Sequence, residues 1–495
     1  MKDTLKYFLL ALVVGLGACT DDFLESEPTE FISTDRMAEM GGQNPEIFNG
    51  TIRGLYTLMY QTGTGGSTGH DDFGQKGFDI YSDLLSGDMV LGGYNYGWYK
   101  DIATLASTVD YRDVDNYRAW RYYYRIIRAA NTIIDGLGGN DVVLDTDNEK
   151  WQMGQAKTMR AYSYFYLANF YLTEYDVNSA ALPLYLSLED KNLGLSTGAD
   201  VWNQIKSDLE QSVVLLDGYS REGIHGVNKD VANGLLAYTY LTMGDYANAA
   251  STAQEVIDNG YAIVPFDYVV GGSAIPRNAF SYYNGEGADW IWGMDLTLDQ
   301  GLDLVSWWGQ VDLFTYSYAW AGDPKTMDMG LYNSIPETDL RKYWFLDPWA
   351  EGLNYPIYKF YDEGRSIGGQ REVTSDYVYM RIEEMYLIKA EAEAFDNKDT
   401  EAKITLSSLV VERNADPSYL DALSGQDLKD EIYKQWRVEM WGEGKSYLAM
   451  KRNHATVVRE GHIDHDGVAI PSNDDRLTFD IPYQEIQDNP NISRN

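Results

Sequence analysis

The sequence predicts a mainly α-helical fold of irregular helical repeats, interrupted by a long, loop-rich, aromatic insertion. Helical periodicity dominates residues from about 117 to 260, and it returns at 376–395 and 427–452. Between about 265 and 375 this pattern gives way to Gly, Asn, Asp, Pro and aromatic residues, and seven of the 13 tryptophans fall in residues 290–349. Binding residues usually lie on loops carried by a rigid scaffold, so the insertion is predicted to form a ligand face.

The helices of the first half can be followed one by one. Residues 117–135 are amphipathic and end at Gly136. Residues 155–172 are apolar almost all round after Met159, so a helix there must be buried between other helices. Residues 201–216 and 231–259 continue the helical pattern.

The stretch 231–259 has the spacing of a tetratricopeptide repeat. The positions that match are Leu236, Ala237, Tyr240, Gly244, Tyr246 and Ala249. Small residues among them let two helices approach, and Gly244 with Asp245 supplies the tight turn between the helices. The neighbouring copies are degenerate, so we expect irregular tetratricopeptide-like repeats.

The composition narrows the class of ligand. The chain has 39 Lys and Arg against 76 Asp and Glu, which gives a net charge of −37. Such a charge repels phosphate backbones and anionic lipid surfaces, and so argues against nucleic-acid binding and electrostatic membrane attachment. The 40 tyrosines and 13 tryptophans offer flat apolar faces with a polar handle, although many must be core.

The amino terminus has the features of a secretory signal. Lys2 and Lys6 precede a short apolar stretch and then small residues up to position 18. Cys19, the only cysteine, follows directly, so an internal disulfide is excluded. The run Leu16-Gly17-Ala18-Cys19 resembles a bacterial lipobox, which implies cleavage before Cys19 and its lipidation. The alternative is an ordinary signal with an incidental cysteine. We expect a signal peptide (1–18), an acidic tether (19–30) and one α-rich domain (31–495).

Two aromatic segments are candidate ligand sites. In "GYNYGWYKD" (93–101), Tyr94, Tyr96 and Trp98 alternate with loop-forming residues, so they either bind a ligand or plug the core beneath a loop. In "SWWGQVDLFTYSYAW" (306–320), Trp308 and Trp320 flank apolar residues at every second position, which favours a strand. Neighbouring Trp307 and Trp308 would then point to opposite faces. Trp320 is the stronger candidate.

Polar residues just upstream add possible hydrogen-bonding groups. His70, Asp71 and Asp72 lie close to the first aromatic segment in sequence. Their side chains could accept hydrogen bonds from ligand hydroxyls, whereas the ordinary interpretation is a solvated, partly helix-capping run.

Enzyme motifs are weak. Ser67 lies in "GGSTG", which fits G-x-S-x-G only formally, because a nucleophile elbow needs a strand before it and a helix after it. The histidines near the C-terminus are too scattered for a zinc motif, and "DHDG" (464–467) lacks the closing Glu of a calcium loop. We therefore expect no catalytic residue, no cofactor and no dedicated metal site, although a structural cation among the many acids stays open.

Five blocks resemble the SusD/RagB family of Bacteroidetes outer-membrane nutrient-binding lipoproteins. They are "YRIIRAANTIID" (124–135), "AKTMRAYSYFYLANFYL" (156–172) followed by "LPLY" (182–185), "YMRIEEMYLIKAEA" (379–392), "WRVEMWGEGKSYLAMKR" (436–452) and "IPYQEIQDNPNISRN" (481–495). They occur in the order of the family and span most of the chain.

The resemblance implies a SusD-like fold and a non-enzymatic function. Proteins of this family are lipid-anchored at the cell surface on the outer membrane, where they lid a SusC-type TonB-dependent transporter. They capture oligosaccharides, or peptides in some members, and pass them to the barrel. The resemblance thus implies a glycan as ligand, with peptide capture as the alternative. A surface hydrolase is a third hypothesis.

Overall fold

The computed structural model describes residues 40, 41, 44, 46–269, 289–347, 351–360, 368, 369 and 375–493. The expected signal peptide, Cys19 and the acidic tether lie outside these residues, as do parts of the expected loop-rich insertion.

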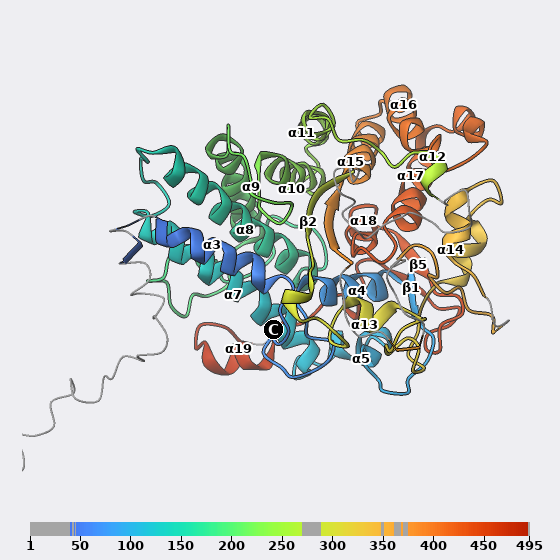
Figure 1. Ribbon diagram of the computed structural model, residues 1–495, viewed down its shortest axis with the longest axis horizontal. Helices are drawn as coiled ribbons and strands as arrows, with labels where there is room; N and C mark the ends of the chain where they lie inside the picture. Colours follow the sequence, from blue (N-terminus) through green and yellow to red (C-terminus); the bar gives the residue numbers. More distant parts are fainter. Residues whose placement is uncertain are drawn as a thin grey trace, which may run out of the picture.

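The first half of the described chain is helical, as the periodicity predicts (Figure 1). Its elements are α3 (Glu46–Leu58), α4 (Gln75–Ser86), β1 (Met89–Leu91), α5 (Lys100–Ala103), α6 (Ala106–Val109), α7 (Val114–Gly136), α8 (Asp147–Tyr171), α9 (Gly198–Leu215), α10 (Lys229–Thr242), α11 (Tyr246–Ile257) and α12 (Phe266–Val269).

Local sequence explains where these helices begin. Thr146 and Glu149 form a reciprocal capping box at the start of α8, and Thr197 with Asp200 does the same for α9. Helix α8 is buried without interruption from residue 152 to 171, which confirms the prediction of a helix that is enclosed on all sides.

Glycines set how closely the helices pack. Gly244 has a φ of +77° in the turn between α10 and α11, the left-handed conformation that glycine adopts at little cost. At Gly234 in α10, an added Cβ would lie 2.4 Å from the sulfur of Met380 in strand β4 (Tyr377–Arg381), so this glycine lets the Met380 side chain pack directly against the helix. Helices α10 and α11 are therefore joined by the expected glycine turn.

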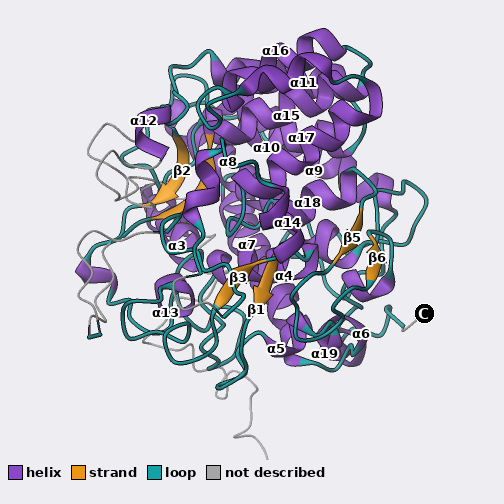
Figure 2. Cartoon of the chain, turned by 90° about the vertical axis from the view of Figure 1, so that its right-hand side faces the viewer, coloured by secondary structure: helices purple, strands orange, loops and turns teal. Residues whose placement is uncertain are grey.

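The remainder of the described chain mixes short elements with a second group of helices (Figures 1 and 2). The elements are β2 (Trp290–Met294), η2 (Leu298–Gln300), α13 (Trp307–Val311), β3 (Lys325–Met327), α14 (Met329–Ser334), η3 (Leu340–Trp344), β4 (Tyr377–Arg381), α15 (Ile382–Phe395), α16 (Asp399–Val410), η4 (Pro417–Ala422), α17 (Gly425–Glu439), α18 (Ser446–Arg452), β5 (Thr456–Val458), β6 (Ala469–Pro471), η5 (Asp475–Leu477) and α19 (Tyr483–Asp488).

Three sequence-based expectations are wrong in this half. Residues 306–320 do not begin as a strand: Ser306 caps the short helix α13, which buries Trp307 and Trp308 together. The helix expected at 376–395 starts as strand β4 and becomes helical only at Ile382. The helix expected at 427–452 is broken between α17 and α18 by a turn in which Gly442 and Gly444 both have positive φ.

The strands form three two-stranded antiparallel sheets in the described residues, β1–β3, β2–β4 and β5–β6. In the first sheet Leu91 pairs with Lys325 and Met89 with Met327. Most buried apolar side chains form one continuous core, whereas Leu313, Ala319, Tyr355 and Ile357 form a small second cluster beneath the loops. The loops that follow α13 are therefore packed.

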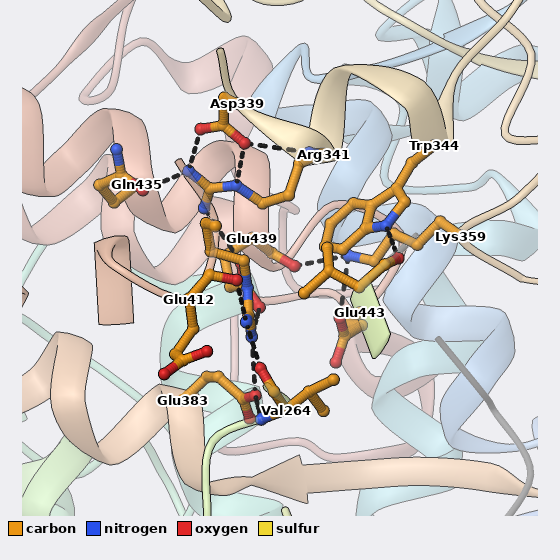
Figure 3. A network of polar contacts seen from close by, with 12 residues as sticks. Val264, Asp339, Arg341, Trp344, Lys359, Glu383, Glu412, Gln435, Glu439 and Glu443 are labelled. Atoms are coloured by element: carbon orange, nitrogen blue, oxygen red, sulfur yellow. Dashed lines mark hydrogen bonds and ion pairs between the residues drawn. The ribbon is translucent and has the colours of Figure 1, made fainter. Parts of the chain in front are cut away.

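A buried ionic network joins the loop-rich region to the C-terminal helices (Figure 3). Its centre is Glu439 of α17, whose carboxylate pairs with Arg381 at 2.7 Å, and with Arg341 and Arg413 at 3.0 Å each. Figure 3 shows Arg341 held between Asp339, Gln435 and Glu439.

In the turn that follows α17, Glu443 pairs with Arg381 and with Lys359, each at 2.9 Å. Burial alone would raise the pKa of Glu443, but the charges of Arg381 and Lys359 outweigh it and lower the pKa to about 2. Glu443 therefore stays ionised through the physiological range, as does Glu439, whose pKa three arginines hold well below its usual value.

Replacing Glu439 with Gln should destabilise the fold strongly. The substitution keeps the shape but leaves three buried guanidinium groups short of a counter-charge, so we expect the free energy of unfolding to fall by about 3–5 kcal/mol. Urea unfolding followed by tryptophan fluorescence measures the change. The matched control is Glu401→Gln on the exposed face of α16, which should shift it by no more than about 0.5 kcal/mol. Equal effects of the two substitutions would contradict this role for Glu439.

Candidate ligand-binding site

The β1–β3 sheet brings the two aromatic segments together. Because the strands are antiparallel, the end of β1 lies beside the start of β3, at the pair Leu91 and Lys325. The loop 92–99 leaves β1 at that end, and the loop 312–324 enters β3 there. The sheet thus fixes two loops that are more than 200 residues apart in sequence at one edge, near α5 and α13 (Figure 2).

Tyr318 is the centre of an aromatic cluster built by these loops. Its ring is 6% exposed and makes edge-to-face contacts with Tyr96, Trp98 and His70, at centroid distances of 5.2, 5.9 and 5.7 Å. Its hydroxyl and Nδ1 of His70 are hydrogen-bonded to each other. The rings of His70 and Trp98 lie parallel, with an interplanar angle of 3° and centroids 5.3 Å apart.

The cluster presents exposed rings around this buried centre. Tyr96 is 62% exposed and Trp98 is half-buried. From the second loop, Trp320 is 55% exposed and packs at 6.3 Å, centroid to centroid, against Tyr316, which is 39% exposed. We name these four residues, with His70 and Tyr318, the aromatic platform.

Asp323 holds the two loops together. Its carboxylate accepts hydrogen bonds from the backbone N–H groups of Tyr96 and Gly97, at 3.0–3.1 Å. The side-chain amide of Asn95 donates to the carbonyl of Ala321 at 2.7 Å. Beneath them, the buried ammonium of Lys325 donates to the carbonyl of Asp323 at 3.2 Å. The exposed rings therefore stand on a backbone that is already ordered.

Lys325 sits in an unusual environment for a cation. Burial lowers the pKa of its ammonium to about 7, although the charges of Asp323 and Asp71 act in the opposite direction. The ammonium also donates to Gln310 at 2.8 Å and lies 5.3 Å from the ring centroid of Tyr99. Gln310 in turn donates to the carbonyl of His70 at 2.8 Å, which ties the loop that carries His70 to the same support.

The structure brings three of the predicted ligand residues, His70, Tyr96 and Trp98, together around Tyr318. Trp320 lies exposed on the same loop as Tyr318, in ring contact with Tyr316. Trp308 is 4% exposed, and its indole N–H donates to the carbonyl of Ser375, so it belongs to the interior.

Tyr94 is half-buried and lies outside the ring contacts that define the platform. Its hydroxyl donates to Asp464 at 2.9 Å, and Lys100 lies over its ring. Burial first, and then the hydrogen bond to Asp464, raises the pKa of this hydroxyl above its usual value.

The two acidic candidates hold the loop from within. Asp71 is buried and pairs with Arg118 of α7 at 2.6 Å. Asp72 is also buried and accepts hydrogen bonds from the backbone N–H groups of Gly65 and Ser67. Neither the expected bonding to sugar hydroxyls nor the ordinary solvated interpretation describes them, because their partners lie inside the protein.

Sequence reasoning missed Tyr318, Tyr316 and Asp323. All three lie in or next to the segment taken for a strand, in which alternate residues would have faced opposite sides. The abundance of aromatic residues there was a signal, but it did not distinguish the buried centre from the exposed rim.

The hydrolase motif lacks the geometry of a nucleophile. Ser67 lies in a turn with neither a strand before it nor a helix after it, and its hydroxyl donates to Asp72 at 3.0 Å. No cluster of three His, Cys, Asp or Glu side chains with metal-binding geometry occurs among the described residues. Within the same residues, no helix is long and apolar enough to cross a membrane.

Comparisons with known proteins agree with this architecture. Residues 89–241 match a family profile described as "Starch-binding associating with outer membrane", and residues 350–495 match the profile of the SusD family. A SusD-like protein of Formosa agariphila is 26% identical over 292 residues. That match covers 58% of this chain and 51% of the relative, about half of its length.

Solved structures share the fold over nearly the whole chain. A SusD-like carbohydrate-binding protein of Bacteroides vulgatus superposes with a TM-score of 0.74 at 22% identity, covering 90% of this chain and 96% of that one. A SusD superfamily protein of Bacteroides thetaiotaomicron gives a TM-score of 0.73 at 22% identity, with 91% and 99% covered. These structures therefore share the fold of this chain also outside residues 89–241 and 350–495, the segments that match the family profiles.

Replacing Asp323 with Ala should loosen the loop that carries Tyr96 and Trp98. Two backbone N–H groups lose a charged acceptor, so we expect hydrogen exchange at Tyr96 and Gly97 to accelerate by about tenfold or more. Exchange followed by mass spectrometry or NMR measures this. The control is Asp299→Ala at an exposed position of η2, which should leave these amides unchanged. Unaltered exchange in the Asp323 variant would show that the platform is ordered by other contacts.

Proposed function

Since the chain belongs to the SusD/RagB family, we propose that it is a cell-surface glycan-binding lipoprotein that captures oligosaccharides and delivers them to a SusC-like TonB-dependent transporter. The observation that carries the proposal is the aromatic platform. Exposed Tyr and Trp rings on two anchored loops match the apolar faces of sugar rings, and the surrounding amide and hydroxyl groups can meet their hydroxyls.

The anchoring of the platform also supports the proposal. Ordering receptor side chains during binding costs free energy. A receptor whose side chains are already ordered avoids this cost and binds its ligand more tightly. Here the buried centre at Tyr318 and the carboxylate of Asp323 supply that order. The exposed area of Trp320 and Tyr96 is then available for contact with the ligand.

Peptide capture is the second candidate function, and the net charge favours it. With −37 over the chain, cationic peptides would be attracted, and the attraction would weaken with salt. The aromatic platform would then contact peptide side chains rather than sugar rings. Catalysis is not part of the proposal, because the family consists of binding proteins and Ser67 is held by Asp72.

Calorimetric titration of the detergent-solubilised full chain with neutral and acidic oligosaccharides, and then with lysine-rich peptides, tests the function. We expect heat with a glycan, and a loss of about tenfold in affinity on Trp98→Ala or Trp320→Ala, because each removes a stacking surface. Tyr343→Ala, an exposed aromatic residue of η3, is the control. Unchanged binding in both tryptophan variants would refute the platform as the site, and heat with peptides alone would establish the second function.

The lipid anchor at Cys19 is a separate part of the proposal. Several acyl chains on one residue anchor a protein firmly, whereas one chain binds a membrane only marginally. We expect Cys19→Ala to abolish incorporation of labelled palmitate and to remove the protein from the outer-membrane fraction of its native cells. Retention of the label in this variant would exclude Cys19 as the lipidated residue.

A further inference from the structure

A cleft separate from the aromatic platform lies between α7, the segment 185–192 and α19. Its volume is about 410 Å³, within the range of small-molecule sites in proteins. Helices α7 and α19 lie beside each other in Figure 1, and α19 lies toward the same lower end of the molecule as α13 and α5. None of the residues that line the cleft belongs to the aromatic platform.

Cations gather along the α7 wall of this cleft. Arg121, Arg125 and Arg128 follow one another at helical spacing on one face, and Lys191 lies on the opposite segment. Arg125 donates to the carbonyl of Thr64 at 3.0 Å. Among the described residues, none of the three arginines has an ion-pair partner. This is unusual in a chain with nearly twice as many acids as bases.

The arginines also repel one another. Burial and then the charge of Arg121 lower the pKa of Arg125 from its ordinary value. Like charges one turn apart destabilise a helix, so an anion bound beside the arginines would relieve an unfavourable arrangement. Guanidinium groups bind carboxylates through paired hydrogen bonds.

Aromatic rings form another part of the lining. Trp120 and Tyr124 of α7 have ring centroids 4.8 Å apart, and Tyr124 meets the ring of Tyr185 edge-on at 5.8 Å. Trp120 is 3% exposed and belongs to the interior, whereas Tyr124 and Tyr185 are half-buried and their exposed parts suit the C–H face of a sugar. The cleft therefore combines an apolar surface with a cationic wall.

The wall opposite α7 is held in place by side chains. Asn131 donates to the carbonyl of Tyr185 at 3.0 Å. From the C-terminal segment, Asn489 donates to the carbonyl of Leu193 at 2.9 Å, and Asn491 donates to that of Asn192 at 2.6 Å. Asn192 itself has a φ of +51°, a left-handed conformation that asparagine tolerates. Contacts within the protein therefore hold this wall of the cleft in place.

Three carboxylates complete the lining. Asp190 accepts the backbone N–H groups of Leu186 and Ser187, and Glu485 accepts the indole N–H of Trp120 at 3.2 Å. Asp488 is exposed. These groups lie on the segments opposite α7, where they can accept hydrogen bonds from hydroxyls, whereas an anionic group is favoured on the α7 side.

We infer that this cleft is a second binding site, which takes an acidic saccharide unit of the uronate class. Its carboxylate pairs with Arg121 and Arg128, its ring lies against Tyr124 and Tyr185, and its hydroxyls face the carboxylates across the cleft. The inference rests on the proposed glycan-binding function and narrows the ligand to acidic glycans.

The test titrates the detergent-solubilised full chain with galacturonate and glucuronate trisaccharides, each beside its carboxyl-reduced counterpart. We expect the acidic form to bind about tenfold more tightly or better, because a charge-assisted pair is lost on reduction. The double substitution Arg121→Gln with Arg128→Gln should abolish that preference. Arg53→Gln, an exposed arginine of α3 paired only with Glu222, makes the same chemical change outside the cleft and should preserve it.

The outcomes separate the two proposals. If acidic and reduced forms bind equally well and the arginine variants change nothing, the cleft proposal is overturned while glycan binding at the platform stands. If the acidic preference is lost in Trp98→Ala but kept in the double arginine variant, the anion is bound at the platform and the cleft proposal is again overturned. If no saccharide binds, the proposed function fails and the cleft inference fails with it.

Discussion

Burial of one carboxylate among three arginines is the constraint on which the rest of the structure depends. Glu439 is fully buried, and its partners come from η3, from the end of β4 and from the chain just after α16. Desolvating such charges is costly, and attraction offsets the cost only when every partner is in place. The network therefore requires the loop-rich region and the C-terminal helices to be assembled together, which simple apolar contact would not demand.

This constraint extends to the aromatic platform through α17. Arg437, two residues before Glu439, pairs with Asp88 at 2.6 Å, and the indole N–H of Trp441 donates to the carbonyl of Asp88. Asp88 directly precedes β1, and its carbonyl also accepts the N–H of Asp328, just after β3. The sheet that positions both platform loops is thus fastened to the helix that carries the ionic centre. The ionic contacts of α17 therefore help to position the loops that carry the exposed platform rings.

The sequence predicted what local patterns determine. The period of the long helices and the glycine turn at Gly244 were correct, because both depend on neighbours within a few residues. Asp71 was misread because its partner, Arg118, lies 47 residues away. The segment 306–320 was misread because Ser306 begins a short helix that buries both neighbouring tryptophans. Tyr318 gains its role only from rings contributed by other loops.

The negative net charge affects how an acidic glycan would approach the cleft between α7 and α19. At −37 the protein repels anions at long range, but this repulsion is screened beyond about 8–10 Å at physiological ionic strength. Within the cleft, the guanidinium groups of Arg121, Arg125 and Arg128 line the α7 side. Attraction therefore acts only at contact, where geometry discriminates between ligands, and the field of the whole molecule does not collect anions indiscriminately. An acidic protein with a local cationic wall gains selectivity at the expense of association rate.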